Sequence, residues 1–368
     1  MKRDNILVYR EKLLLPSEGF IKTHYINFDE LNPFFLTNQL GWDIHKLGFD
    51  FLSTKNSLLQ KTNFRLFGNI SKDLQIKIDH LKPKLIHAHF GKNGATVLPF
   101  AKKSSLPLFV TYHGGDATKF IHLKKSKFRI YNRRRNDLIK YSTKFICVSE
   151  FIAKKLLDQG FPDEKIIVNY IGINPKDNKF LKKENTKEKP LVFVGRLVEK
   201  KGINILIKSI DSLNKGGYPN LKINIIGSGP LENQLKKQTN NPNISFLGWK
   251  SEQEIESIFE NSSALIVPSH EAINGDSEGL PTVILEGINN EIPIITTYHG
   301  GAGEIIENHK TGFITFENDH IALAKSIIEF LKSDNIEDIL VNAKKNLTQN
   351  FNAKKQSYKL QNIFQENI

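Results

Sequence analysis

The sequence predicts an α/β protein with two parallel-sheet domains. The chain has 368 residues, and at about 100–200 residues per domain this length suits two domains. Both halves alternate short apolar runs with amphipathic stretches, and several runs contain four or more consecutive apolar residues, as strands buried on both faces of a parallel sheet do. Between the halves, residues 174–190 contain only two apolar side chains apart from the prolines. Such a stretch is typical of an interdomain linker.

The apolar runs give the order of the elements. In the first half we predict strands over residues 6–9, 85–89, 108–112, 145–148 and 166–170, with a further strand near 44–49. In the second half we predict strands over 191–194, 223–226, 244–247, 264–267, 292–296 and 313–315. The helices between them are predicted over 202–214, 230–238, 252–261, 281–289, 302–308 and 320–332, with a final helical stretch over 336–364. Strands that alternate with helices form parallel sheets covered on both faces.

This pattern divides the chain into two Rossmann-like domains that we expect to face each other across a cleft. The first domain is predicted over residues 1–174, the linker over 175–190 and the second domain over 191–345. A C-terminal helix over 346–368 is expected to cross back and pack towards the first domain.

Composition narrows the class of protein. Apolar residues make up 39% and charged residues 25% of the chain, which is close to ordinary globular usage and excludes a disordered or collagen-like chain. The single cysteine, Cys147, cannot form an intrachain disulfide or a cysteine-rich metal site. No run reaches the roughly 18 apolar residues of a membrane span, and the first residues contain no signal-peptide core. We therefore expect a cytoplasmic protein.

The excess positive charge lies entirely in the first half. Residues 1–175 carry 29 Lys and Arg against 15 Asp and Glu, whereas the rest of the chain carries 23 against 24. A one-sided basic field favours an anionic partner such as a membrane surface, a lipid phosphate or a nucleic acid. Its densest part, residues 119–143, includes Arg133, Arg134 and Arg135 with apolar residues between the charges. This segment fits either an interfacial helix or a solvated helix face with a buried stripe.

In the second half, a lone arginine marks a candidate phosphate site. Arg196 follows the predicted strand over 191–194, with Lys200 and Lys201 just before the next helix. Ligands of open parallel sheets bind beyond the carboxyl ends of the strands. Arg196 is the only arginine in a half that has 22 lysines, and its forked guanidinium suits phosphate oxygens. The alternative is a solvated loop.

Two carboxylates and a glycine turn are further candidates. Glu278 lies on a loop, and Glu286 lies eight residues later within a helix predicted to begin at Pro281, so both can face one site. Carboxylates accept hydrogen bonds from sugar and ribose hydroxyls. Alternatively, Glu278 caps the helix and Glu286 is solvated. The turn that contains Gly227 and Gly229 could present amides to a nucleotide or could be a plain tight turn.

In the first half, histidines follow two apolar runs. His87 and His89 end one predicted strand, and His113 follows the next, with Asp116 three residues later. No spacing supports a metal set, because alternation along a strand places only His87 and His89 on one face. We expect these histidines to contact sugar hydroxyls or an acceptor.

Together these motifs resemble the GT4 family of retaining glycosyltransferases, which has the GT-B fold. In the second half, the series of motifs is Val194-Gly-Arg-Leu, Lys200-Lys-Gly, Gly227-Ser-Gly, Phe246-Leu-Gly-Trp249, and Glu278-Gly-Leu-Pro followed by Glu286. The first half is similar to the exopolysaccharide and colanic-acid subgroup. Its motifs there are Leu15-Pro-Ser-Glu-Gly-Phe-Ile21, His87-Ala-His-Phe-Gly91, Thr111-Tyr-His-Gly-Gly-Asp116 and Cys147-Val-Ser-Glu-Phe-Ile152.

The resemblance implies a role for each matched residue. Arg196 and Lys201 would hold the donor diphosphate, with Gly19 nearby, although Gly19 stands where the subgroup more often has threonine. Glu286 would bind the ribose. Glu278 would bind the donor sugar, and His113 would lie by its 6-hydroxyl and the reacting carbon. Four residues would lie near the sugar and nucleotide: Gly227, Gly229, Gly279 and Leu280. Three would lie near the acceptor: His87, His89 and Asp116.

The resemblance also implies the reaction and its partners. The enzyme would be a hexosyltransferase that moves a sugar from a nucleotide-diphosphate sugar, with UDP-galactose or UDP-glucose favoured, and retains the anomeric configuration. No metal and no cofactor are expected, because basic side chains and helix amides stabilise the leaving group. The acceptor would be an undecaprenyl-type lipid-linked glycan in capsule, exopolysaccharide or O-antigen biosynthesis. We expect Arg133, Arg134 and Arg135 to attach the protein to the anionic inner face of the cytoplasmic membrane.

Two other functions compete with this interpretation. A GT-B sugar-nucleotide epimerase would use the same donor site without an acceptor, but we find no second acid–base pair for the sugar ring. A nucleic-acid-binding module would use the basic half, but that half has no aromatic stacking platform or known motif. We therefore expect no nucleic-acid partner.

Overall fold

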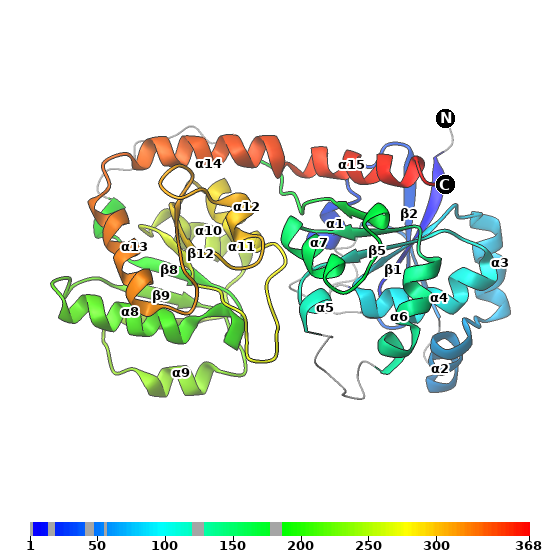
Figure 1. Ribbon diagram of the computed structural model, residues 1–368, viewed down its shortest axis with the longest axis horizontal. Coiled ribbons are helices and arrows are strands. Elements are labelled where there is room, and N and C mark those ends of the chain that lie inside the picture. The colour runs from blue at the N-terminus through cyan, green and yellow to red at the C-terminus, as the bar shows by residue number, and fades with distance from the viewer. Residues whose placement is uncertain (1–2, 14–18, 41–47, 55–56, 120–128, 177–185) are drawn as a thin grey trace. The chain divides into compact units, whose positions relative to one another are not determined.

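A computed structural model describes residues 3–13, 19–40, 48–54, 57–119, 129–176 and 186–368, and the structural statements below concern these residues. The chain forms two compact units: unit 1 contains Met1–Ile173 together with Ala353–Ile368, and unit 2 contains Asn174–Asn352. Each unit has one sheet with helices packed around it (Figure 1). Every strand pair described is parallel. The predicted α/β class with two parallel sheets is therefore confirmed.

The sheet of unit 1 has the strand order β3-β2-β1-β4-β5-β6-β7. Its strands are β1 (Asp4–Tyr9), β2 (Leu31–Thr37), β3 (Phe51–Ser53), β4 (Ile86–His89), β5 (Leu108–Tyr112), β6 (Lys144–Cys147) and β7 (Ile166–Val168). After β1 the next strands along the chain, β2 and β3, are added on one side of it, and β4 to β7 are added on the other side. The direction in which strands are added therefore reverses between β1 and β4. In open parallel sheets, ligands bind outside the carboxyl ends of the strands at such a reversal.

Helices of unit 1 pack around this sheet. They are α1 (Gly19–Thr23), α2 (Leu58–Phe67), α3 (Lys72–Leu81), α4 (Gly91–Ser104), α5 (Gly115–Thr118), α6 (Arg129–Tyr141), α7 (Glu150–Leu157) and α15 (Ala353–Gln365). Serine side chains cap several of them; Ser149, for example, accepts from the Ile152 N–H at the start of α7. One buried cluster joins β1, β2 and α1 to α15 through Leu360, Ile363 and Phe364.

Unit 2 has a six-stranded sheet in the order β10-β9-β8-β11-β12-β13. The strands are β8 (Leu191–Val194), β9 (Ile223–Ile226), β10 (Ile244–Gly248), β11 (Leu265–Val267), β12 (Ile294–Thr297) and β13 (Phe313–Thr315). The chain order reverses between β8 and β11, which marks the carboxyl ends of these two strands as the expected ligand edge.

The helices of unit 2 agree closely with the apolar periodicity. They are α8 (Ile203–Lys215), α9 (Glu232–Gln238), α10 (Glu252–Glu260), α11 (Thr282–Asn289), α12 (Ala302–Ile305), α13 (His320–Lys332) and α14 (Ile336–Asn350). A capping box between Ser251 and Glu254 fixes the start of α10. The main core of the unit packs α8 and α13 against the sheet.

Two strands of unit 1 differ from the prediction. β2 was not predicted, because Pro33 interrupts its apolar run and a proline usually argues against an inner strand, yet β2 pairs with both β1 and β3. The strand predicted near residues 44–49 falls mostly on 41–47, which lie outside the described residues. The strand that is described there is β3, three residues long and partly exposed, so it carries little apolar signal.

The C-terminal helical stretch is two helices rather than one. α14 ends at Asn350, and α15 begins at Ala353, whose N–H donates to Ile173 O at 2.9 Å. Phe351 lies between them and is buried. The Phe351 side chain is buried and the Ala353 N–H is bonded outside the helix, so the helix is interrupted at this junction. The two helices belong to different units.

Candidate functional site

The loops at the carboxyl edge of the unit 2 sheet pack directly on one another. The Leu197 N–H donates to Ser228 O at 3.0 Å. A Cβ atom on Gly227 would lie 1.9 Å from Gly195 O, and one on Gly229 would lie 2.4 Å from Leu197 O. These two glycines are therefore needed for the contact between the loop after β9 and the loop after β8. The packing of these two loops is thus a structural reason for the glycine turn, in agreement with the interpretation as a tight turn.

A charged cluster lies on the loops that follow β8 and β11. The Lys200 ammonium lies 3.2 Å from Asp276 Oδ1 and 3.3 Å from Glu278 Oε1, and the Lys201 ammonium also lies 3.3 Å from Glu278 Oε1. Lys200 and Lys201 belong to the 3₁₀ turn η6 (Glu199–Lys201), which directly precedes α8. One carboxylate oxygen is thus shared by two lysines at the edge where a ligand is expected.

The electrostatics of this cluster keep Glu278 ionised. Burial raises the pKa of Glu278, but the charges of Lys201 and Lys200 outweigh burial and lower the pKa to about 2. Burial likewise opposes the charge of Lys200, yet Glu278 and Asp276 raise its pKa above the ordinary value. At neutral pH Lys200 and Glu278 are therefore both charged, and an incoming polyanion would compete with Glu278 for the lysines.

A buried histidine holds the backbone of Glu278. The Glu278 N–H donates to His299 Nε2 at 3.1 Å, and His299 Nδ1 lies 2.6 Å from Glu317 Oε2. The adjoining residues are also fixed, since Gly279 O accepts from Gly301 N–H at 2.8 Å and Leu280 is buried. The loop that carries Glu278 is therefore supported by the segments that follow β12 and β13.

Arg196 and Glu286 are both exposed on unit 2. Arg196 follows β8 by two residues, and among the described residues its guanidinium forms no ion pair. Glu286 lies in the second turn of α11. Desolvation and the charge of Glu252 raise the pKa of Glu286, and a hydrogen bond with Thr282 and the charge of Lys201 act in the opposite direction. The structure thus joins Lys201 to Glu278 by an ion pair, whereas in the part of the chain that the structure describes no ion pair joins Arg196 or Glu286 to them.

In unit 1, the predicted histidines form a buried hydrogen-bonded group. His87 and His89 are fully buried, and the Tyr25 hydroxyl lies 2.6 Å from both His87 Nδ1 and His89 Nε2. His87 Nε2 lies 2.6 Å from Thr111 Oγ1, and His89 Nδ1 lies 3.0 Å from His113 Nε2. His113 therefore stands at one end of the group, and His87 and His89 lie behind it rather than open to a ligand.

Asp116 organises the backbone around His113. Its carboxylate accepts from the N–H groups of His113 and Gly114 at 2.9 Å and from the Gly91 N–H at 3.0 Å. Burial raises the pKa of Asp116, and these three hydrogen bonds act in the opposite direction. The side chain that was assigned to the acceptor vicinity thus joins the loop after β4 to the loop after β5.

Gly19 is the first residue of α1, and a Cβ atom there would meet nothing within 4 Å. The preceding part of its motif, residues 15–18, lies outside the described residues. Among the described residues, none therefore requires glycine at this position.

The three consecutive arginines of α6 differ in their contacts. Arg134 donates to Arg65 O at 2.6 Å, Ala95 O at 3.0 Å and Leu66 O at 2.8 Å. Arg135 donates to Gln159 O and lies over the ring of Phe161, whereas Arg133 is exposed. Two of the three guanidinium groups are therefore used within the protein. Residues 120–128 of the same basic segment lie outside the described residues.

Several residues of these groups were not identified from the sequence as site residues. Tyr25, Thr111, His299 and Glu317 each complete a contact between segments far apart in the chain. Spacing along the chain carries no signal for such contacts. The exception is His299, which directly precedes a glycine pair at the end of a predicted strand.

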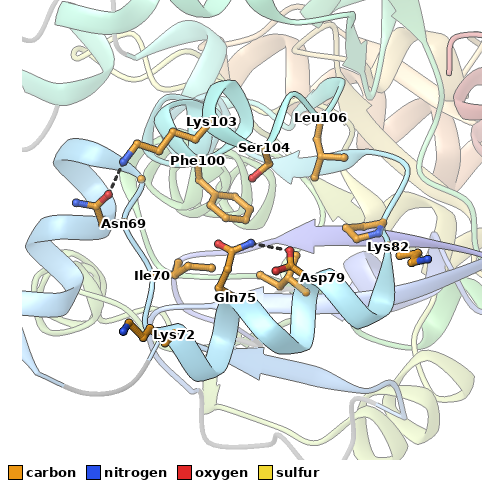
Figure 2. Close-up of a pocket in the computed structure, with 13 residues that line it drawn as sticks. Asn69, Ile70, Lys72, Gln75, Asp79, Lys82, Phe100, Lys103, Ser104 and Leu106 are labelled. Carbon is orange, nitrogen blue, oxygen red and sulfur yellow. Dashed lines mark hydrogen bonds between the residues drawn. The ribbon is translucent and has the colours of Figure 1, made fainter.

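A pocket of about 610 Å³ also occurs in unit 1, between α3 and the C-terminal part of α4. Figure 2 shows Gln75 bonded to Asp79 and Lys103 bonded to Asn69 beside it. The pocket lies where β4 and β5 begin, at the opposite end of these strands from His89 and His113. Within the described ranges, no group of three or more His, Cys, Asp or Glu side chains is arranged to hold a metal ion.

Known proteins resemble both parts of the chain. The family described as "Glycosyl transferases group 1" matches residues 175–349, and the family "Glycosyltransferase Family 4" matches residues 52–177. The putative colanic acid biosynthesis glycosyltransferase WcaL of Salmonella typhimurium is 26% identical over 321 residues, which cover 82% of this chain and 77% of that protein.

Two further comparisons bear on ligands. A Campylobacter jejuni enzyme named GalNAc-alpha-(1->4)-GalNAc-alpha-(1->3)-diNAcBac-PP-undecaprenol alpha-1,4-N-acetyl-D-galactosaminyltransferase is 31% identical over 168 residues, 45% of each chain. The crystal structure of Anabaena Alr3699/HepE in complex with UDP-glucose has a TM-score of 0.75 at 17% identity, covering 98% of this chain and 99% of that one. This last similarity shows the fold alone.

The two family matches together cover residues 52–349, and the fold agrees with a solved glycosyltransferase along the whole chain. The structure and the comparisons lead to the same assignment: the chain belongs to the group 1 and family 4 glycosyltransferases, with the GT-B fold.

Proposed function

We propose that this glycosyltransferase moves a hexose from a UDP-sugar to a lipid-linked glycan during polysaccharide biosynthesis, with retention of configuration. The observation that carries the proposal is the pair Lys200 and Lys201 around Glu278, at the reversal of strand order in unit 2. Two ammonium groups that are already held in place suit a diphosphate, because no side chain needs to be ordered when the ligand binds.

Each donor group has a proposed role. The exposed Arg196 guanidinium and Lys201 would bind the diphosphate and stabilise the charge that develops as the nucleotide leaves. The ionised Glu278 would accept hydrogen bonds from the sugar hydroxyls, and Glu286 from the ribose. His113 would contact the sugar near the reacting carbon. No metal is included in the proposal, because the lysines and the arginine supply the positive charge.

Comparison supports the donor and acceptor classes. Uridine diphosphate is proposed because the HepE structure was obtained with UDP-glucose. A lipid-linked acceptor is proposed because the Campylobacter relative is named for an undecaprenol-linked substrate, and a polysaccharide pathway because WcaL is named for colanic acid biosynthesis.

A product assay tests the reaction. The protein would be incubated with a panel of UDP- and GDP-sugars, with and without bacterial lipid extract, and the products identified by mass spectrometry. We expect nucleotide release and a glycosylated lipid only when UDP-sugar and extract are both present. Conversion of the sugar nucleotide without an acceptor would instead show an epimerase, and consumption of no donor would refute the proposal.

Calorimetry separates the roles of the two carboxylates. Glu286→Ala should weaken UDP binding, whereas Glu278→Ala should leave UDP binding near normal and reduce sugar transfer. Glu337→Ala is a matched control, because Glu337 is also exposed in a helix of unit 2 but lies in α14. If Glu278→Ala weakens UDP binding and Glu286→Ala does not, the two roles are exchanged.

We also propose peripheral attachment to the cytoplasmic membrane through unit 1. No helix in the described ranges is long and apolar enough to span a membrane. α2, whose C-terminal carbonyls bind Arg134, exposes four large apolar side chains, Leu58, Leu59, Leu66 and Phe67. Exposed apolar groups beside basic residues fit an interfacial surface. Attraction to anionic lipid is worth about 1 kcal/mol per basic residue near the surface and is screened by salt.

Vesicle flotation tests the attachment. Binding to anionic phospholipid vesicles should weaken in high salt and with Arg133→Ser or Leu59→Ser. Arg134 and Arg135 are left unchanged, because their guanidinium groups bind backbone carbonyls. Equal binding to neutral and anionic vesicles would contradict the electrostatic part, and no effect of either substitution would contradict this surface.

A further inference from the structure

Five side chains of unit 1 form one continuous hydrogen-bonded chain. It runs from Thr111 Oγ1 through His87, the Tyr25 hydroxyl and His89 to His113 Nε2, with successive distances of 2.6, 2.6, 2.6 and 3.0 Å. The members come from β5, β4 and the segment after α1. The chain ends at His113 Nδ1, which is buried and has no hydrogen-bond partner among the described residues.

The three imidazole rings of this chain are neutral. Burial lowers the pKa values of His87, His89 and His113 well below the ordinary value, and the nearby histidines and Arg10 add to this effect. His24, edge-on to His89 at 5.7 Å, has its pKa lowered to about 4 by burial. A neutral imidazole has one N–H donor and one acceptor nitrogen. Each ring must therefore accept on one side and donate on the other.

This requirement leaves only two directions for the protons of the whole chain. The Tyr25 hydroxyl has one proton, so it donates to either His87 or His89 and accepts from the other. If the protons point from His113 towards Thr111, the Thr111 hydroxyl accepts and its own proton is left over. Within the described ranges, Thr111 Oγ1 has no second partner, and an unsatisfied buried donor is costly.

The opposite direction leaves one group without a partner among the described residues, the His113 Nδ1–H at the end of the chain, whereas the first direction leaves two, the Thr111 proton and the His113 Nδ1 lone pair. Thr111 then donates to His87 Nε2, His87 Nδ1–H donates to Tyr25, Tyr25 donates to His89 Nε2, and His89 Nδ1–H donates to His113 Nε2. His113 is consequently protonated on Nδ1 and presents that N–H at the end of the chain. A donor in this position can bind an oxygen lone pair, such as that of a sugar hydroxyl, and cannot accept a proton there.

We propose that Tyr25 is a positioning residue that, through His89, fixes His113 as the Nδ1–H tautomer, so that His113 offers a hydrogen-bond donor to the sugar. The use of that donor by a sugar rests on the proposed function, whereas the tautomer does not. α15 supports the arrangement from behind, since the Phe364 ring packs 4.9 Å from that of His87.

Nitrogen NMR tests the tautomer without any substrate. In ¹⁵N-labelled protein, long-range ¹H–¹⁵N spectra distinguish protonated from unprotonated ring nitrogens, and loss of signals in His113→Gln assigns that residue. We expect Nδ1 of His87, His89 and His113 to be protonated in the unmodified protein. Tyr25→Phe removes the hydroxyl and should leave His89 and His113 as a mixture of tautomers. His113 protonated on Nε2 in the unmodified protein, or an unchanged pattern in Tyr25→Phe, would overturn the proposal.

A matched control is available on β5. Tyr112 is also fully buried, and its hydroxyl bonds to that of Tyr131 at 3.1 Å, outside the chain. Tyr112→Phe should leave the histidine pattern unchanged; a change as large as that of Tyr25→Phe would show that any lost tyrosine hydroxyl disturbs the rings and would contradict the proposal. Thr111→Val and Thr111→Ser provide a second pair, in which only valine should alter the tautomers. This pair decides the question even if Tyr25→Phe does not fold.

Kinetics then connect the tautomer to transfer. Tyr25→Phe should lower kcat/KM for the sugar nucleotide by about tenfold, the value of one hydrogen bond to a buried donor, while the dissociation constant of UDP alone stays unchanged. If no donor is turned over, the proposed function fails while the NMR result still decides the tautomer. If the tautomers shift as expected but kcat/KM does not fall, His113 is not the sugar donor.

Discussion

The substitution Gly227→Ala would test whether the glycine turn after β9 has a structural role. Gly227 has a φ of +129°, and an added Cβ atom would lie 1.9 Å from Gly195 O. Real Cβ contacts are essentially never shorter than 3.0 Å, so one of the two loops must move by more than an ångström. The neighbouring atoms are backbone and cannot rotate away as a side chain could.

The expected magnitude follows from two separate costs. A non-glycine residue at such a φ costs roughly 1–3 kcal/mol. The movement also weakens the hydrogen bonds from Gly195 to Ile226 and from Gly227 to Gly248, which are 3.0 and 2.8 Å long. At about 1 kcal/mol each, these add about 2 kcal/mol. Gly217→Ala isolates the first cost, because Gly217 has a φ of +110° with nothing within 4 Å of its Cβ position.

Urea unfolding monitored by circular dichroism would compare the two variants. We expect Gly227→Ala to lower the free energy of unfolding by about 2 kcal/mol more than Gly217→Ala, with the same dependence on urea. UDP binding should weaken only in Gly227→Ala, because Arg196 directly follows the displaced Gly195. Equal stability of the two variants would refute the close contact between the loops.

Three further outcomes are expected. Burial lowers the folded-state pKa values of four histidines, His24, His87, His89 and His113, below the unfolded value of about 6.5. Below pH 6.5 the unfolded chain therefore binds more protons than the folded protein. The free energy of unfolding should be highest above that pH and decrease below it, by up to about 1.4 kcal/mol per pH unit for each histidine. Urea titrations between pH 7.5 and 5 measure this, and a flat profile would contradict the neutral buried rings. Replacing Arg134 by Met should destabilise the protein by about 2–3 kcal/mol, because three carbonyls lose their donor, whereas the same change at the exposed Arg133 should cost less than about 0.5 kcal/mol; similar melting temperatures would show that the Arg134 contacts do not stabilise the fold. His299→Phe should leave the Glu278 N–H unpaired, cost about 1–3 kcal/mol in urea unfolding and reduce transfer, and a fully active, equally stable variant would exclude His299 as a support of that loop.

The sequence predicts unit 2 better than unit 1 because every strand of unit 2 is rich in apolar residues and contains no proline. The predicted strands over 191–194, 223–226 and 313–315 coincide with β8, β9 and β13. In unit 1, Pro33 interrupts the apolar run of the inner strand β2, so this strand is not predicted. β3 is too short and too exposed to give an apolar pattern. Local periodicity is informative only where burial follows it.

The site was predicted in part for a similar reason. Lys201 and Glu278 each follow a predicted strand, and the carboxyl ends of parallel strands lie at one edge of a sheet. The sequence therefore correctly predicts that the two residues lie together. It also suggested that His87 and His89 face a ligand, whereas they are buried behind His113. Their partner Tyr25 is more than sixty residues away in the chain, and no pattern of spacing links the two segments. Pairings of this kind arise from tertiary packing alone.

The membership of α15 in unit 1 has a consequence for the order of folding during synthesis. Leu360, Ile363 and Phe364 fill the core of unit 1, and the Gln361 side chain bonds to the backbone of residues 29–31. Domains usually fold as they leave the ribosome, the N-terminal one first. Here the first unit to be translated lacks part of its core until the last helix emerges, so unit 2 can complete its own core before unit 1 does. The buried His87, whose ring packs against Phe364, would be covered only at the end of translation.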